Sequence, residues 1–353
     1  MTMLESTGRR LRNTARYLLG VGEPELGQSP RQLVGTRDKV KLWRYESDDR
    51  HLAPPVLLVM SLVTKPVVFD LQPGNSLVEH FCNAGFDVWM IDWDEPGPAD
   101  AENTLETYCD DYIPWAVESV ATESGCGTVT LFGYCLGGVL SLLSVAGNPT
   151  MPVENLVVLA TPIAPERGPA QLHPGRIAAS FDETGNVPAE LIRTAFVSLD
   201  PMDAWFTGRV NLWQRMDNDQ FVMAHRVVTN WGNDHIRFPG ATARQIAASF
   251  RDGNQILEGT FRLGGRRIDL GAVAVPFLSV VGERDHMAPP ASSEPLLDLV
   301  GSEDKSELRV PAGHVGLFVG GSAAKHSIPG MIEWMRAHSG DAERPPAKRG
   351  RGG

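Results

Sequence analysis

One cysteine in this sequence has the local setting of a catalytic nucleophile. Cys135 lies in the segment GYCLGG (residues 133–138), after the apolar run 128–133 and directly before a second apolar run. A strand, a sharp glycine-flanked turn and a helix in this order form the setting in which a G-x-S-x-G motif presents its nucleophile. Glycines remove side chains where strand and helix cross closely. The pattern therefore predicts Cys135 at the apex of a tight turn, facing a cleft.

The helix that starts after Cys135 would supply hydrogen-bond donors for a negatively charged intermediate. Free backbone N–H groups and the positive end of a helix favour a thiolate and a developing oxyanion. Leu136 N–H is the first predicted oxyanion donor, and the second is expected from the loop after the strand 56–61, at Val63. A tight turn with a buried cysteine is the alternative interpretation, because free cysteine often packs as a small hydrophobic residue.

Two later loops supply an acid and a base in the chain order that such a nucleophile requires. After the nucleophile, the acid and then the histidine each follow a separate strand. Asp285 follows the apolar run that ends at Val281, and His314 follows the run 308–311. The sequence thus predicts a triad of Cys135, Asp285 and His314. Glu283 is an alternative acid, since an aspartate in this position can also be an ordinary turn residue.

The strands and helices that must position these loops alternate along the chain. Short apolar runs predict strands at 39–45, 56–61, 86–92, 128–133, 156–161, 277–281 and 308–311. Segments of helical length, such as 76–84 and 104–124, lie between several of them, which is the pattern of a parallel sheet with crossover helices. Together with the triad order, this alternation predicts an α/β-hydrolase fold, with helices on both faces of a mostly parallel sheet.

The alternation stops after Thr161 and resumes near Val275, which predicts a cap inserted between two strands. Leu11, Ala15 and Leu18 share one face of a predicted amphipathic helix near the N-terminus, which either docks on the core or binds a partner. The predicted divisions are an N-terminal helical extension (1–36), the first part of the core (37–165), the cap (166–262), the second part of the core (263–339) and a disordered tail (340–353).

Composition excludes several other functions. The formal charge of −11 argues against a general nucleic-acid-binding surface, which needs a positive field. The four cysteines lack paired metal-ligand spacing and the density of a disulfide framework, which favours a reducing cytoplasm and no metal site. The longest apolar runs are about half of the roughly 20 residues that a membrane helix needs, so no membrane span is expected.

From 45 to 334 the chain resembles the polyhydroxyalkanoate synthases, especially the short catalytic subunits of the two-subunit class III type. The segments that carry the resemblance are DLQPG (70–74), DW (92–93), GYCLGG (133–138), NQILEGTFRLGGRRIDL (254–270), GERDHMAPPASS (282–293) and AGHVGL (312–317). The cap segment 215–240 matches only loosely. The resemblance implies Cys135, Asp285 and His314 as the family's nucleophile, acid and base.

The resemblance also implies a reaction and its setting. It implies polymerisation of (R)-3-hydroxyacyl-CoA into polyester through a covalent thioester on Cys135, with release of CoA. The CoA thioester would be a substrate, with no separate cofactor. Further implied are a smaller second subunit, a homo-oligomer, and a cytoplasmic location at the polyester granule surface. A thioesterase or polyester depolymerase with the same triad is the main alternative, and a non-catalytic granule or scaffold protein is the other.

Overall fold

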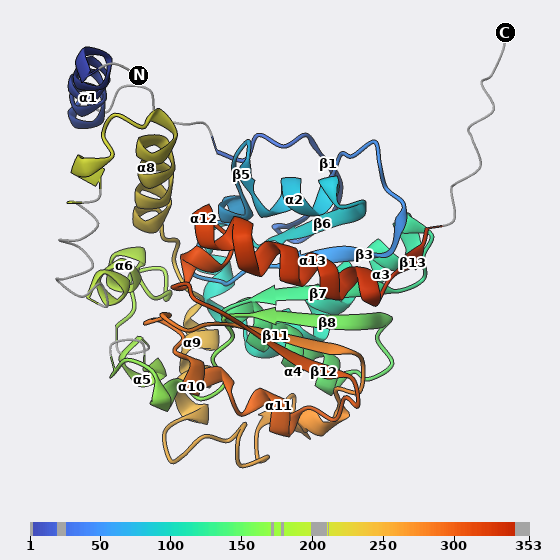
Figure 1. Cartoon of the computed structure of the whole chain (residues 1–353). Coiled ribbons are helices and arrows are strands. Elements are labelled where there is room, and N and C mark those ends of the chain that lie inside the picture. Colours follow the sequence, from blue (N-terminus) through green and yellow to red (C-terminus); the bar gives the residue numbers. More distant parts are fainter. Residues whose placement is uncertain are drawn as a thin grey trace, which may run out of the picture.

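The computed structural model describes residues 3–19, 26–170, 173–177, 180–198, 210 and 212–342. Nine strands form one sheet in the order β1-β2-β6-β3-β7-β8-β11-β12, with β13 pairing to β3. Their bounds are β1 (Arg31–Arg37), β2 (Val40–Tyr45), β3 (Leu52–Val59), β6 (Phe86–Asp92), β7 (Val129–Tyr134), β8 (Val153–Leu159), β11 (Phe277–Gly282), β12 (Lys305–Val310) and β13 (Gly340–Asp341). The sheet forms the centre of the molecule in Figure 1.

The middle of the sheet is parallel and deeply buried. The neighbouring pairs from β6 through β3, β7, β8 and β11 to β12 all run parallel, whereas β1 and β2 are antiparallel additions at one edge. Every residue of β7 and of β11 is buried, which is typical of strands covered by helices on both faces. The carboxyl ends of β7, β11 and β12 therefore lie along one edge, where the triad loops begin.

Two hydrophobic cores lie on opposite faces of the sheet. Helices α3 (Ile113–Ser124) and α4 (Leu136–Gly147) contribute to one core, and α2 (Leu77–Asn83) and α13 (Ile328–Ala337) contribute to the other (Figure 1). Helix α3 ends at Gly125, whose φ of 76° is a left-handed conformation that glycine adopts without strain. The mostly parallel sheet covered by helices confirms the predicted fold class.

Shorter elements complete the core. Two small hairpins pair β4 (Asp70–Gln72) with β5 (Asn75–Ser76), and β9 (Arg262–Leu263) with β10 (Arg266–Arg267). Short helical segments include η1 (Pro66–Phe69), η2 (Pro98–Glu102), η3 (Thr107–Tyr112), η4 (Pro165–Arg167), η6 (Leu270–Ala272), η7 (Val315–Leu317), η8 (Ala323–Ser327), α10 (Pro290–Ser293), α11 (Leu296–Leu299) and α12 (Gly320–Ser322). No helix in the described ranges is long and apolar enough to cross a bilayer.

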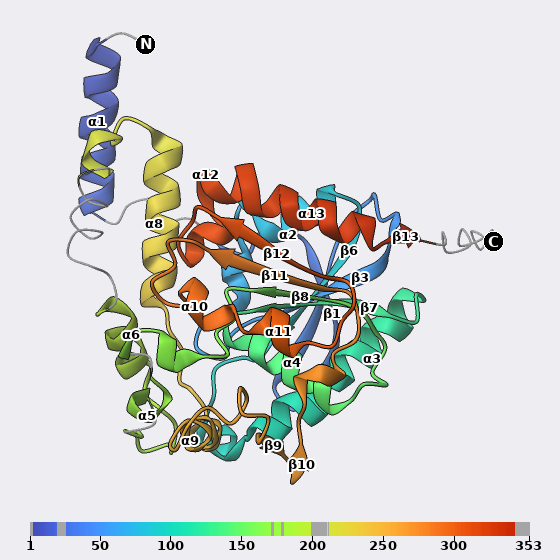
Figure 2. The same ribbon diagram turned by 60° about the horizontal axis from the view of Figure 1, so that its bottom comes forward.

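The segment between β8 and β11 contains the described helices of the cap. These are α5 (Pro174–Ile177), α6 (Ala189–Val197), α8 (Asp219–Asn233) and α9 (Gly240–Ser249). They lie beside the sheet rather than within its layers, as Figures 1 and 2 show from two directions. Helix α1 (Met3–Leu18) contacts α8 and stands with it away from the sheet.

Two predicted boundaries are wrong. The extension 1–36 was expected to be helical, but β1 starts at Arg31 and forms an antiparallel hairpin with β2. The edge position leaves much of β1 exposed, so it lacks the apolar run that marks the central strands. The tail 340–353 was expected to be disordered, but Gly340 and Asp341 pair with Ala53 and Leu52 of β3. Such a pairing uses backbone groups and leaves little trace in the side-chain pattern, and 343–353 lie outside the described residues.

Candidate active site

Cys135 occupies a strained turn between β7 and α4. Its φ of 54° and ψ of −122° are unusual for a residue with a side chain, and its N–H donates to Leu159 O at 2.8 Å. A Cβ on Gly133 would lie 2.5 Å from Gly138 Cα, and one on Gly137 would collide with the Val59 and Met60 carbonyls. The glycines are therefore required by the close crossing of strand and helix, as the motif predicted.

Asp285 and His314 form the buried acid–base pair of the site. The Oδ2 atom of Asp285 lies 2.7 Å from His314 Nδ1, and the two residues are 2% and 7% exposed. The other oxygen of Asp285, Oδ1, accepts hydrogen bonds from the N–H groups of Met287 and Ala288, both at 2.8 Å. These contacts fix the carboxylate and, through it, the orientation of the His314 ring, whose pKa also responds to the nearby Cys135 side chain.

The charge state of His314 follows from its neighbours. Burial alone would lower its pKa, but the charge and hydrogen bond of Asp285, together with the contact to Cys135, raise the pKa of His314 to about 10. The imidazole can therefore take a proton from the thiol and hold it as an imidazolium. Glu283, the alternative acid, is exposed, and the carboxylate at His314 is that of Asp285.

Tyr134 is a member of the site that the sequence reasoning missed. Its ring centroid lies 5.0 Å from that of His314, and it also packs against Phe69 and Phe318. Burial, with smaller contributions from Cys135 and Asp285, raises its pKa well above the ordinary value, so the phenol stays neutral. Its position next to Cys135 in the motif was the available signal. The ring supports the imidazole through packing rather than through proton transfer.

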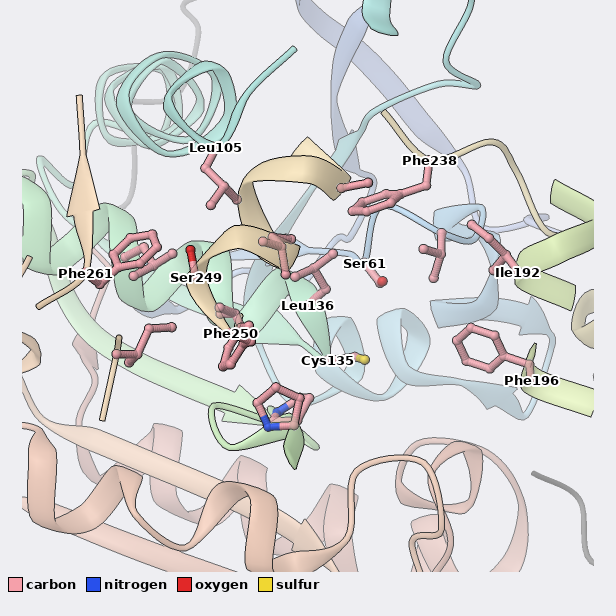
Figure 3. Close-up of a pocket in the computed structure, with 18 residues that line it drawn as sticks. Ser61, Leu105, Cys135, Leu136, Ile192, Phe196, Phe238, Ser249, Phe250 and Phe261 are labelled. Atoms are coloured by element: carbon pink, nitrogen blue, oxygen red, sulfur yellow. The ribbon is translucent and has the colours of Figure 1, made fainter. Parts of the chain in front are cut away.

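The two predicted oxyanion donors border the same cavity as Cys135. Leu136 is the first residue of α4, where a backbone N–H lacks a partner within the helix, and Val63 lies in the loop after β3. Figure 3 shows Leu136 and Ser61 beside the sulfur of Cys135. The assignment of the two N–H groups as oxyanion donors stays a prediction.

The loop that carries Val63 is held from two sides. From the core, the indole Nε1 of Trp93 donates to Met60 O at 2.9 Å. From the cap, Ile236 N–H donates to Val63 O at 3.2 Å, a bridge pairs Thr64 with His235, and Lys65 pairs with Asp234 at 2.7 Å. We call residues 234–236 and 63–65 the cap clamp. Its cap half directly follows α8, and no sequence motif pointed to it.

An apolar cavity of about 180 Å³ leads away from Cys135. Its floor comes from α4, with Leu136, Val139 and Leu143, and much of its wall comes from the cap. Four phenylalanines line it, namely Phe196, Phe238, Phe250 and Phe261 (Figure 3). Besides Cys135, the side chains of Ser61 and Ser249 are the polar ones in this lining. The cavity therefore suits a hydrocarbon or ester chain and disfavours water.

A smaller hollow of about 70 Å³ adjoins the triad. Cys135 and His314 both line it, together with Met287, Ser292 and residues of the 162–169 loop. Cys135 therefore lines both spaces. Among the described residues, no group of three or more His, Cys, Asp or Glu side chains is arranged to hold a metal ion.

The fold and the triad geometry define a protein of the α/β-hydrolase class. A family model of the alpha/beta hydrolase fold matches residues 54–321. A soluble variant of monoglyceride lipase from Saccharomyces cerevisiae has a similar fold, with a TM-score of 0.56 and 15% identity over 90% of this chain and 98% of that one. A hydrolase from Pseudomonas aeruginosa PA01 gives a TM-score of 0.54 and 16% identity, covering 89% and 99% of the two chains. These likenesses concern the fold alone.

Sequence relatives narrow the class to one family. The poly(3-hydroxyalkanoate) polymerase subunit PhaC of Allochromatium vinosum is 33% identical over 93% of this chain and 94% of its own length. The proteins of the same name from Haloferax mediterranei and Thiocystis violacea are 33% and 31% identical, over 93% and 96% of this chain and 68% and 96% of their own lengths. The chain belongs to the poly(3-hydroxyalkanoate) polymerase family, which confirms the resemblance.

Proposed function

We propose that this chain is the catalytic subunit of a polyhydroxyalkanoate synthase that polymerises (R)-3-hydroxyacyl-CoA through a thioester on Cys135. The observation that carries the proposal is the buried Asp285–His314 pair, which shares a hollow with the strained Cys135, a residue that also lines an apolar cavity. Membership of the polymerase family supplies the reaction class, an acyl transfer. The geometry supports Cys135, Asp285 and His314 as the residues that carry it out.

In the first step His314 removes the thiol proton and the Cys135 thiolate attacks the thioester carbonyl of the substrate. The developing oxyanion faces the N–H groups assigned to Leu136 and Val63. When the carbon–sulfur bond to CoA breaks, the imidazolium of His314 returns the proton to the CoA sulfur. One thioester replaces another at little free-energy cost, so the acyl group stays activated on the protein. A serine ester would lose that activation.

Chain growth uses the same groups in a second transfer. The 3-hydroxyl of another hydroxyacyl unit attacks the acyl thioester on Cys135, and His314 accepts the hydroxyl proton. A new ester bond forms, the bond to Cys135 breaks, and His314 gives the proton back to the sulfur. Asp285 keeps the imidazole oriented and stabilises its charged form throughout. The apolar cavity holds the acyl chain and excludes the water that would hydrolyse the intermediate.

The test is the fate of a hydroxyacyl-CoA. Purified protein with (R)-3-hydroxybutyryl-CoA should release CoA, form insoluble polyester and carry a hydroxyacyl mass on the peptide that contains Cys135. A stoichiometric yield of free hydroxy acid with the released CoA, and no polymer, would identify a thioesterase or depolymerase instead. The exposed Cys126 provides a matched control, because Cys126→Ala should leave all three readouts unchanged.

The same proposal includes a smaller second subunit, a homo-oligomer and a cytoplasmic location at the surface of the polyester granule. The names of the relatives describe them as polymerase subunits, which supports an assembly of more than one kind of chain. Activity should be measured with and without the product of a neighbouring reading frame. Full activity and long polymer from this chain alone would contradict the requirement for a second subunit.

A further inference from the structure

Helix α1 presents an apolar face that nothing in the described structure covers. It lies beside α8 and apart from the sheet, at the upper left of Figures 1 and 2. The side chains of Leu11, Leu18 and Leu19 are 69%, 78% and 75% exposed. Single exposed leucines are common on protein surfaces, but two on one helix face with a third directly after the helix end form a patch that indicates a binding site.

The opposite face of α1 is fixed by specific contacts, so the orientation of the leucines is determined. Asn13, only 6% exposed, donates from Nδ2 to Met216 O at 2.8 Å and to Asp219 Oδ1 at 2.6 Å. The Ser6 hydroxyl donates to Asp217 at 2.9 Å. Tyr17 packs against the small cap cluster of Leu212, Met216 and Val222. These contacts direct the leucine face away from α8.

The spacing of the exposed face is that of a helix–helix seam. Gly8, Leu11, Ala15 and Leu18 recur at alternating intervals of three and four residues, and Leu19 adjoins them. Large and small side chains alternate along this line, which leaves room for the side chains of a facing helix. We call these five residues the leucine seam. Its shape fits one further α-helix.

Charge indicates what kind of helix that is. The helical period places Arg16 and Arg9 beyond one edge of the leucine seam, both exposed, in a chain whose net charge is −11, whereas Arg12 on the same edge already pairs with Asp219 at 3.3 Å. Two copies of α1 facing each other would bring these arginine edges together. Asp217 and Asp219 on the inner face pair with Arg10 and Arg12, which leaves Arg9 and Arg16 for a partner. An acidic partner helix satisfies these two arginines without that repulsion, and its side chains fit the alternation of large and small residues along the leucine seam, which a lipid surface would not use.

We propose that the leucine seam of α1 is the docking site for an acidic amphipathic helix of a second polypeptide. This inference rests on the proposed function, since it gives a contact surface to the second subunit proposed above. The surface is connected to the active site through α8, because α8 ends at Asn233 and leads directly into the cap clamp. A docked helix is therefore linked to the cap clamp through α1 and α8.

A designed peptide tests the docking site on the full chain. The probe is a fluorescent helical peptide with leucines at heptad spacing and glutamates beside them, and its control carries lysines in place of the glutamates. The acidic peptide should bind the native chain at least tenfold more tightly than the basic one. The double variant Leu11→Asp/Leu18→Asp should lose at least tenfold in affinity for the acidic peptide. Leu33→Asp, an exposed leucine on β1, should bind like the native chain.

Reversing the charge of Arg9 and Arg16 tests the role of these arginines separately from that of the leucine seam. Arg9→Glu/Arg16→Glu should invert the preference, so that the basic peptide binds more tightly than the acidic one. Circular dichroism checks that α1 is still helical in each variant. Equal binding by the native chain and the Leu11→Asp/Leu18→Asp variant would overturn the proposal. So would seam-dependent binding to phosphatidylglycerol vesicles, or seam-dependent dimerisation in sedimentation, without binding of the acidic peptide.

A failure of the docking proposal can be distinguished from a failure of the proposed function. Cys135→Ala removes the proposed nucleophile but leaves α1 untouched, so this variant should bind the acidic peptide with unchanged affinity. If the chain proves to be a hydrolase, the peptide result still stands as a statement about α1. If the peptide does not bind while polyester forms, the docking proposal alone is wrong.

Discussion

The acid–base pair and the outer helices α1 and α8 are held in place by different means. Asp285 and His314 follow two adjacent parallel strands, β11 and the edge strand β12, and are almost completely buried beside one of the two large cores. Helices α1 and α8 instead share a small cluster of their own, around Leu212, Met216 and Val222, supported by polar contacts such as those of Asn13.

This difference separates two tasks. Proton transfer needs one fixed geometry, and the sheet supplies it by ordering consecutive loops along one edge. The acyl chain needs an apolar wall, and α6 and α9 of the cap contribute to it. The cap clamp is one of the places at which cap and core meet, and it bonds the segment after α8 to the loop of Val63. Substitutions at the triad should therefore mainly reduce turnover, whereas substitutions in the cap and α1 should have smaller effects, on substrate preference, loop positioning or local stability.

The largest effect is expected at the nucleophile. Cys135→Ala should reduce CoA release by about 10⁴-fold or more, because covalent transfer is no longer possible. The hydroxyacyl mass on the peptide should also disappear. Cys126→Ala is the matched control. Residual polymerisation within tenfold of the native rate would show that the chemistry does not use Cys135.

The next largest effect is expected in the buried pair. Asp285→Asn should lower turnover by about 10³-fold, since the imidazole loses both its orientation and its charge partner. It should also lower the pKa of His314 from about 10 towards its ordinary value, and below it if burial dominates. Histidine NMR titration measures this shift. Glu283→Gln, on the same loop but exposed, should change neither quantity.

The same pair gives a pH dependence of stability. The folded pKa of His314 is raised, so protonated His314 stabilises the fold fully below its unfolded pKa of about 6.5, and this contribution is lost as the pH rises through about 10. The difference in unfolding free energy between the native chain and Asp285→Asn should therefore be larger near pH 6 than near pH 10. Denaturant titrations at the two values check it, and a difference that grows with pH would contradict this linkage.

The sequence predicted the core side of this comparison better than the cap side. The glycine-flanked turn and the strand-to-loop positions of Asp285 and His314 are local patterns, and buried parallel strands have clear apolar runs. Strand β1 was missed because its edge position leaves it largely exposed, and β13 because two residues carry no periodicity. The cap clamp depends on a backbone N–H and an exposed ion pair between segments far apart in the chain, which no local pattern encodes.

A cap substitution should change substrate choice rather than chemistry. Ala243 lies on α9, lines the apolar cavity and is only 2% exposed, so Ala243→Leu should reduce the space for the acyl chain. Turnover of (R)-3-hydroxyhexanoyl-CoA should fall about tenfold more than that of (R)-3-hydroxybutyryl-CoA. Ala248→Leu, on the exposed side of α9, is the control. An equal loss for both substrates would place the acyl chain elsewhere.

A smaller effect is expected at the cap clamp. Lys65 and Asp234 are each about half exposed, with side-chain values of 46% and 49%, so their ion pair contributes little to stability. Lys65→Met should leave the unfolding midpoint unchanged and lower kcat about threefold, because the Val63 loop is less firmly held. Arg37, on β1, forms a similarly exposed ion pair with Asp111 of η3. Arg37→Met removes this pair and should leave kcat unchanged. Equal kcat in both variants would show that the clamp does not position the loop.

The smallest effect on catalysis is expected from loosening α1. Asn13→Ala removes two hydrogen bonds, one to Met216 and one to Asp219 at the start of α8, so the amides of α1 should exchange with solvent about tenfold faster. The main unfolding midpoint should stay constant, because α1 packs on α8 and not on the sheet. Polymerisation of (R)-3-hydroxybutyryl-CoA by the chain alone should also be unchanged. A parallel fall in α1 protection and in the unfolding midpoint of the sheet would mean that the two regions unfold as one unit, and the separation between core and cap would then be wrong.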